Sequence, residues 1–321
     1  MQSERRSAVD TRQRDAIRQT VRELTSSSPK LSAFVGGTPG VDALLDGIED
    51  VWMGWRGTHL HLDFHRAARP RATIVFQPGV GSDARAYFLL GAMLARRGYH
   101  FLGVDRPGHG LSPGPRGECT VEEALESTAS ALRFARETHG LPVVLLGSSF
   151  GGLLTGFSLL TGQRPELAIA HNFLIPGKLA SMRLRSRYIH WFRQKPYRIR
   201  ELAHDFKGMT SDPALARYFA EEADPGMAWR LSAPSVASLL GFDVPRERVP
   251  RDAPPLVVLS GMKDDTIPSW ASRLFLHLSG LPRTEFRRVP GAGHLLFHEH
   301  LDLALPVLEE VLDAYLPRPG R

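Results

Sequence analysis

The fold of this chain is decided by the stretch Val143-Val144-Leu145-Leu146-Gly147-Ser148-Ser149-Phe150-Gly151-Gly152. A run of apolar, partly β-branched residues leads into a Gly-x-Ser-x-Gly pattern, and an apolar, small-residue segment follows it directly. This order predicts a buried strand, a very tight turn and a buried helix. Ser149 lies at the apex, between Gly147 and Gly151, which have no side chains to clash in so sharp a turn. Because such short patterns also recur by chance, the interpretation depends on partners elsewhere in the chain.

A serine hydroxyl is a poor nucleophile unless a base takes its proton and an acid orients that base. Candidates for both follow later strands of the chain, at the strand ends where α/β sheets place their sites. The strand at residues 256–260 is followed by Asp264, and the strand that ends at Val289 is followed by His294. The chain order Ser149, Asp264, His294 is the order of one recurrent triad arrangement.

Strands and helices alternate from residue 72 to residue 176, and the alternation resumes after residue 250. Such alternation predicts a mostly parallel sheet that is covered by helices on both faces. The interruption is helical and loop-like, and we interpret it as an inserted cap. The predicted division is an N-terminal helical extension (1–50), a core (51–176 and 251–321) and a helical cap or lid (177–250).

Five segments in order resemble the α/β-hydrolase-fold serine hydrolases, and the resemblance covers roughly residues 55–176 and 251–316. The segments are Gln77-Pro78-Gly79-Val80-Gly81, Asp105-Arg106-Pro107-Gly108-His109-Gly110-Leu111-Ser112, Gly147-Ser148-Ser149-Phe150-Gly151, Gly261-x-x-Asp264 with Pro268, and Gly291-Ala292-Gly293-His294. The helical cap resembles that of the monoacylglycerol lipase and lysophospholipase group. The resemblance implies the α/β-hydrolase fold, with a mostly parallel twisted sheet, helices on both faces and an inserted helical cap.

The resemblance also implies a role for each site residue. Ser149 is the expected nucleophile, His294 the general base and later acid, and Asp264 the group that orients His294. The backbone amides of Phe150 and Val80 are expected to form the oxyanion hole, where each such donor typically contributes about 10²- to 10³-fold in rate.

The oxyanion turn departs from the usual pattern of the family, and the orienting acid has a neighbouring alternative. Members of the family usually have His-Gly in the oxyanion turn, whereas Pro78-Gly79 stands here, and proline has no amide proton to donate. Asp265 is an alternative to Asp264, and the spacing from Gly261 favours Asp264.

The expected activity is that of a serine hydrolase, of carboxylesterase or lipase type, that cleaves a carboxylic ester through an acyl-serine intermediate, without metal or organic cofactor. Thioesters, lactones, amides and carbon–carbon bonds are cleaved on the same scaffold with similar residues, so they remain alternative substrates. A non-catalytic binding protein with the same fold is another alternative. An NAD-binding oxidoreductase is an alternative from another class of protein. Gly79-Val80-Gly81 follows a strand and Asp105 ends the next strand, which is close to the dinucleotide-binding pattern of a glycine-rich turn and a distant acid.

The composition indicates which cellular compartment and which kinds of partner are expected. The chain has 321 residues, of which 42% are hydrophobic, and Cys119 is its one cysteine, which fits a reducing cytoplasm. No apolar stretch reaches about 18 residues and the start is highly charged, so neither membrane insertion nor a secretory signal is expected. The net charge of +6 is not accompanied by a nucleic-acid motif, so nucleic acid is not an expected partner. The oligomeric state is not predicted.

The predicted cap carries a basic stretch. Residues 178–200 contain eight Lys or Arg and no acidic residue, and aromatic residues lie between them, namely Tyr188, Trp191, Phe192 and Tyr197. One hypothesis is that the cap receives an anionic or lipid-like substrate or approaches an anionic surface. We favour the simpler interpretation that these charges form a solvated helix face.

Several histidines are interpreted as structural. His59, His61 and His65 share one face of a strand, and a solvated face is favoured over a metal site because no further ligand cluster completes it. His298 and His300 are interpreted as residues on the surface of a helix.

Overall fold

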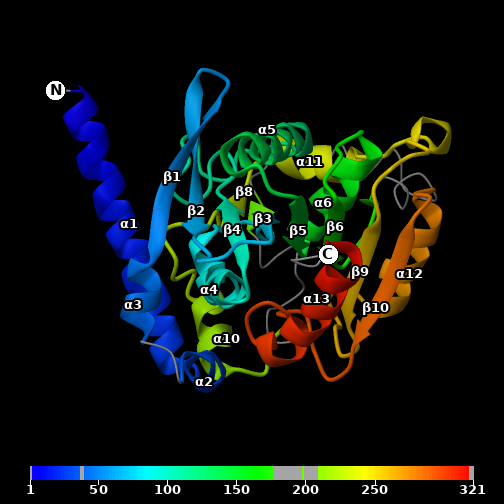
Figure 1. Cartoon of the computed structure of the whole chain (residues 1–321). Coiled ribbons are helices and arrows are strands. Elements are labelled where there is room, and N and C mark those ends of the chain that lie inside the picture. The colour runs from blue at the N-terminus through cyan, green and yellow to red at the C-terminus, as the bar shows by residue number, and fades with distance from the viewer. Residues whose placement is uncertain (1, 37–39, 177–196, 199–208, 318–321) are drawn as a thin grey trace.

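A computed structural model of the chain describes residues 2–36, 40–176, 197–198 and 209–317. Its main feature is an eight-stranded sheet with the strand order β1-β2-β4-β3-β5-β6-β9-β10 (Figure 1). The strands are β1 (Ile48–Trp55), β2 (Thr58–His65), β3 (Ala72–Gln77), β4 (Tyr99–Val104), β5 (Val143–Ser148), β6 (Leu167–His171), β9 (Leu256–Gly261) and β10 (Thr284–Val289). From β4 to β10 along this order neighbouring strands are parallel, whereas β2 is antiparallel to both β1 and β4. The predicted, mostly parallel sheet is confirmed.

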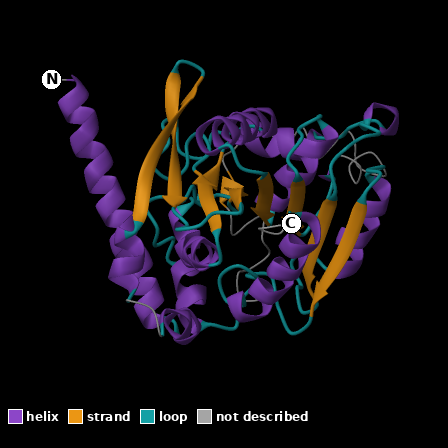
Figure 2. Cartoon of the chain, viewed as in Figure 1, coloured by secondary structure: helices purple, strands orange, loops and turns teal. Residues whose placement is uncertain are grey.

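Helices cover both faces of this sheet (Figure 2). The described helices are α1 (Gln2–Ser27), α2 (Pro29–Val35), α3 (Val41–Asp46), α4 (Phe88–Arg96), α5 (Val121–His139), α6 (Phe150–Leu160), α10 (Pro213–Ala220), α11 (Ala233–Gly241), α12 (Ser269–Leu278) and α13 (Leu301–Tyr315). Two 3₁₀ turns, η1 (Arg85–Tyr87) and η3 (Arg246–Arg248), and a short antiparallel pair, β7 (Tyr197–Arg198) with β8 (Arg230–Leu231), complete the described elements. None of the described helices combines the length and the apolar character needed to cross a membrane.

The core lies on both faces of the central strands because successive side chains of a strand point to opposite faces. Ile74, Phe76 and Leu146 pack in one cluster with residues of α4 and α13. Val75 and Leu145 are neighbours of these residues along the two strands, and they pack on the other face with residues of α5. The near-continuous apolar runs of β3 and β5 are therefore explained by burial on both sides.

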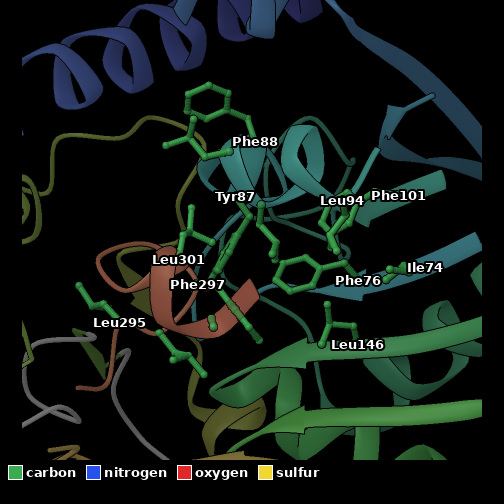
Figure 3. Packing of buried hydrophobic residues seen from close by; sticks show 14 of the residues in the cluster. Ile74, Phe76, Tyr87, Phe88, Leu94, Phe101, Leu146, Leu295, Phe297 and Leu301 are labelled. Atoms are coloured by element: carbon green, nitrogen blue, oxygen red, sulfur yellow. The ribbon is translucent and has the colours of Figure 1, made fainter. Parts of the chain in front are cut away.

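Aromatic packing joins the sheet to two of its loops. The ring centroid of Phe76 lies 4.7 Å from that of Tyr87 and 6.3 Å from that of Phe297 (Figure 3). Tyr87 ends η1, in the connection after β3, and Phe297 follows His294 in the connection after β10. The core thus fixes the two connections that flank the candidate site.

The N-terminal segment is part of this core. Ile17, Val21 and Leu24 recur at the spacing of a helix, and the structure forms α1 there. Ile17 and Val21 are each 2% exposed and belong to the same cluster as residues of α4 and α13. Ser28 ends the helix region and accepts a hydrogen bond from the amide of Leu31 at 3.0 Å, which begins α2.

The basic stretch of the predicted cap, residues 178–200, lies outside the described residues except for Tyr197 and Arg198. The described part of residues 177–250 contains the helices α10 and α11, which agrees with its predicted helical character. The division of the chain into extension, core and cap stays a prediction.

The turn between β5 and α6 has the predicted geometry. Ser149 has φ 52° and ψ −116°, a strained backbone conformation that is typical of the residue at the apex of this kind of turn. A Cβ atom at Gly147 would lie 2.0 Å from the carbonyl oxygen of Gly151. A Cβ atom at Gly151 would lie 1.9 Å from the carbonyl oxygen of Gln77, so α6 touches the end of β3.

Replacement of Gly151 by alanine should therefore destabilise the protein. We expect Gly151→Ala to lower the free energy of unfolding by about 2 kcal/mol or more, because the contact is with rigid backbone. Gly54→Ala is the matched control, since a Cβ atom there meets nothing within 4 Å, and it should change stability by less than about 0.5 kcal/mol. Urea unfolding of both variants measures the difference, and equal effects would contradict the contact.

The structure corrects our interpretation of the histidines on β2. His59 is exposed, but His61 and His65 are 1% and 3% exposed, because helices and charged partners cover that part of the strand. His61 Nδ1 lies 2.8 Å from Asp105 Oδ2, and its Nε2 lies 3.0 Å from Asp50 Oδ1. The prediction of a solvated strand face is wrong for these two histidines.

A carboxylate cluster does surround His61, contrary to our expectation. Ligand atoms of Asp50, His61 and Asp63 lie within 4.8 Å of one another, as a metal site requires. Arg85 already neutralises these carboxylates, because its guanidinium donates to Asp63 at 2.9 Å and to Asp50 at 2.6 Å. The arrangement is that of a buried network of ion pairs.

This network predicts how stability depends on pH. Burial alone would lower the pKa of His61, but hydrogen bonds to Asp105 and Asp50 raise it to about 10. The pKa in the unfolded chain is about 6.5, so the stabilisation is fully present below that pH and is lost as pH rises towards 10. We expect the stability advantage of the wild type over His61→Gln to shrink by roughly 1 kcal/mol or more between pH 6 and pH 9.5.

Urea unfolding at several pH values measures this change. His59→Gln, on the same strand but exposed, is the control and should follow the wild type at every pH. A stability difference between wild type and His61→Gln that is independent of pH would contradict a charged His61.

Candidate active site

The structure brings Ser149, Asp264 and His294 together at the carboxyl ends of the parallel strands. Ser149 lies between β5 and α6, Asp264 follows β9, and His294 follows β10. His294 Nε2 lies 3.0 Å from Ser149 Oγ, and His294 Nδ1 lies 2.9 Å from Asp264 Oδ2. With the Nδ1 proton donated to the carboxylate, Nε2 is free to accept the serine proton. Asp264 and His294 are each 4% exposed, so this chain of hydrogen bonds is largely shielded from water.

Asp264 is held as an ionised acceptor. The amides of Thr266 and Ile267 donate to its Oδ1 at 2.9 Å and 2.8 Å. Burial alone would raise the pKa of Asp264, but the hydrogen bond with His294 lowers it. Asp265, the alternative acid, is exposed and makes none of these contacts.

Asn172 is a site residue that our reading of the sequence missed. Its Nδ2 donates to Asp264 Oδ2 at 2.7 Å, and it has φ 66°, which is uncommon outside glycine. It follows β6, which lies next to β9 in the sheet. The signal in the sequence was a polar residue directly after a buried strand, at the edge where the other site residues gather.

The turn after β3 adjoins the serine. A Cβ atom at Gly79 would lie 3.8 Å from Ser149 Cβ. Among the described residues, no group accepts a hydrogen bond from the amide of Val80 or of Phe150. The Phe150 amide is the first of α6 and has no intrahelical partner by position. Within the described residues, the two amides predicted for an oxyanion hole thus have no hydrogen-bond acceptor, and their role stays a prediction.

A buried arginine supports this turn, and we did not anticipate it from the sequence. Arg106 is 1% exposed and donates to the carbonyl oxygens of Pro78 at 2.8 Å and Gly79 at 2.7 Å. Its guanidinium carbon lies 5.2 Å from the ring centroid of Phe150. The Gly79 amide donates to the hydroxyl of Tyr87 at 3.1 Å. Side chains thus hold the turn on both sides although it lacks the usual histidine.

A pocket opens beside Ser149 and His294. Its described lining carries no side chain of Asp, Glu, Lys or Arg. Most of the lining is apolar, and six of these residues are Leu24, Val80, Leu215, Phe219, Met227 and Leu295.

The remaining histidines near the site differ in part from expectation. His298 is not on a helix surface as predicted, because it precedes α13, lines the pocket and lies 4.2 Å from Tyr87 between ring centroids. Burial lowers the pKa of His298 to about 4, so its ring is neutral near pH 7. His300 is also partly buried, directly before α13. His171 lies behind His294, at 5.6 Å between ring centroids.

His171, Asp264 and His294 also meet the distance requirement for a metal site. Their nitrogens already face partners within the protein, since the two nitrogens of His294 contact Ser149 and Asp264. His171 Nε2 lies 3.1 Å from Asn172 Nδ2, and its Nδ1 lies 3.4 Å from Ser148 Oγ. All four ring nitrogens of the two histidines thus have polar neighbours in the described residues.

Asp105 and Cys119 have structural surroundings that do not suggest a dinucleotide site or a reactive thiol. Asp105, the candidate ribose ligand, contacts His61 and accepts hydrogen bonds from the amides of Ala84 and Leu111 at 2.8 Å and 2.9 Å. Burial raises the pKa of the Cys119 thiol to about 12, so Cys119 is not a reactive thiolate.

The chain is similar to known proteins in sequence and in fold. The family model for serine aminopeptidase S33 matches residues 68–300, which is more than half of the chain. A phospholipase, YtpA of Bacillus subtilis (strain 168), is 37% identical over 90 residues, which are 28% of this chain and 34% of the phospholipase. The match thus spans about a third of that relative's length.

Solved structures support the same fold. Monoglyceride lipase from Saccharomyces cerevisiae superposes with a TM-score of 0.66 at 17% identity, over 84% of this chain and 96% of the lipase. Monoacylglycerol lipase from Paleococcus ferrophilus gives 0.59 at 21% identity, over 80% and 98%. A carboxyl esterase from Bacillus coagulans gives 0.64 at 17% identity, over 84% and 97%. With the family match over residues 68–300, the chain belongs to the serine aminopeptidase S33 family and has the α/β-hydrolase fold.

Proposed function

We propose that this protein is a serine hydrolase that cleaves a carboxylic ester through an acyl intermediate on Ser149. The observation that carries the proposal is the continuous hydrogen-bond chain from Ser149 through His294 to Asp264, at the mouth of an apolar pocket. A neutral imidazole between a hydroxyl and a buried carboxylate is the arrangement that activates serine in unrelated hydrolases.

The proposed reaction has two halves. In the first, His294 Nε2 takes the Ser149 proton as Oγ attacks the ester carbonyl, and the same proton then passes to the leaving alcohol. In the second, His294 takes a proton from water as the water attacks the acyl-serine, and returns that proton to Ser149 Oγ as the bond to the acyl group breaks and the acid is released. Asp264 orients the imidazole and stabilises its charged form. The amides of Phe150 and Val80 would stabilise the oxyanion of both tetrahedral intermediates.

Relatives support an ester as the substrate. The similar proteins are named as a phospholipase, monoacylglycerol lipases and a carboxyl esterase, all of which act on esters by name. The apolar lining fits an ester with a lipid-like part. Thioesters, lactones, amides and carbon–carbon bonds remain alternatives, since the same scaffold cleaves them with similar residues. The basic segment 178–200 could recruit an anionic ester, although no charged side chain lines the described pocket.

Removal of the Ser149 hydroxyl should abolish turnover. We expect Ser149→Ala to lower kcat on p-nitrophenyl esters by about 10⁴-fold or more, and to abolish labelling by a fluorophosphonate probe. Ser158→Ala is the matched control, because Ser158 is a buried serine on α6 whose hydroxyl has no hydrogen-bond partner. That variant should keep both activity and labelling. A wild-type protein that is folded but never labelled would instead favour the non-catalytic alternative.

The adjacent aspartates provide a second test. Asp264→Asn should lower kcat by about 10³- to 10⁴-fold, because the amide cannot hold the required tautomer of His294. Asp265→Asn should leave kcat within about twofold of the wild type, since Asp265 is exposed and contacts no site residue. Steady-state kinetics on one ester decides between them, and the reverse result would make Asp265 the orienting acid.

A further inference from the structure

Helix α1 lies outside the segment that matches the family model, since that match begins at residue 68. The helix nevertheless contributes to the pocket beside the triad, because Leu24 lines it together with Ser149 and His294. Leu24 lies about two helical turns after Ile17 and about one turn after Val21, so the two buried residues fix the helix and Leu24 extends the same face to the pocket.

The N-terminal segment is also bonded to the elements that form the rest of the pocket. Ser28 Oγ donates to Asp212 Oδ2 at 2.6 Å, and Asp212 caps α10 by accepting from the amide of Ala214 at 2.8 Å. Helix α10 supplies Leu215 and Phe219 to the lining. Figure 1 shows α2 and α10 next to each other at the lower edge of the view.

An ion pair also links the N-terminal segment to the loop between β10 and α13, which carries His294. Lys30 pairs with Glu299, which is 2% exposed and follows the pocket residue His298. Glu299 also accepts hydrogen bonds from the hydroxyls of Thr210 and Ser211, both at 2.5 Å. One buried carboxylate therefore joins the N-terminal segment, the start of the α10 region and the histidine connection.

We infer that α1 is a wall of the substrate pocket and that Leu24 limits the size of the apolar chain the pocket accepts. The inference rests on the proposed function for the chemistry at Ser149, but the wall itself rests on packing. The ligand part in question is a neutral aliphatic chain, because the described lining is apolar and carries no charged carboxylate, ammonium or guanidinium group.

The test is the chain-length profile of kcat/KM on p-nitrophenyl esters from two to ten carbons. A buried methylene contributes about fourfold in binding. Leu24→Ala should raise the ratio of ten-carbon to four-carbon kcat/KM about tenfold, and Leu24→Trp should lower it by a similar factor. Ile17→Ala is the matched control on the same helix: it removes buried volume away from the pocket, so it should lower stability and leave the ratio unchanged.

The outcomes separate this inference from the proposed function. A wild type that cleaves esters, with the same ratio in both Leu24 variants, would overturn the inference alone. A wild type that cleaves no ester would overturn the proposed function, and calorimetric binding of 2-alkanones of four to ten carbons would then test the wall without catalysis. Equal chain-length preference in the wild type and Leu24→Ala in that assay would overturn the inference as well.

Discussion

The site depends on the close contact between the start of helix α6 and the end of strand β3. No side chain fits at Gly151 against the carbonyl oxygen of Gln77, so the helix can approach the neighbouring strand end directly. That approach puts the amide of Phe150 beside the turn that carries Val80. The Phe150 side of the candidate oxyanion hole is consequently positioned by backbone packing, whereas the side chains of Arg106 and Tyr87 hold the Val80 side.

Arg106 explains how the turn after β3 can hold its shape without the usual histidine. It donates to two carbonyl oxygens of that turn, and its planar group faces the ring of Phe150. Hydrogen bonds to carbonyl oxygens, instead of an ion pair to a carboxylate, engage the two terminal nitrogens of this buried cation, whereas its Nε has no hydrogen-bond partner among the described residues. The side chain that holds the turn is therefore that of Arg106, which follows β4, and not that of the residue at position 78.

The sequence was sufficient to predict the sheet and the meeting of Ser149, Asp264 and His294, because each residue lies within a few positions of the end of a predicted strand and parallel strands end at one edge. It was not sufficient for Asn172, Arg106 or His61. Their roles depend on which strands become neighbours: Asn172 meets Asp264 only because β6 lies beside β9, and His61 meets Asp105 because β2 pairs with β4. Local spacing cannot supply that adjacency. The role of Leu24 was missed for the same reason, since the fold brings α1 to the pocket from a distant part of the chain.

The backbone of Ser149 has a consequence for how this protein can change over evolutionary time. A non-glycine residue at φ 52° and ψ −116° costs about 1–3 kcal/mol of folding free energy. Glycine would adopt the same conformation without that cost, but it would bring no hydroxyl. Selection for a stable fold thus favours glycine at position 149, whereas selection for a nucleophile favours serine. The compensating stability has to come from residues elsewhere, and the fully buried strands on either side of β5 are well placed to supply it.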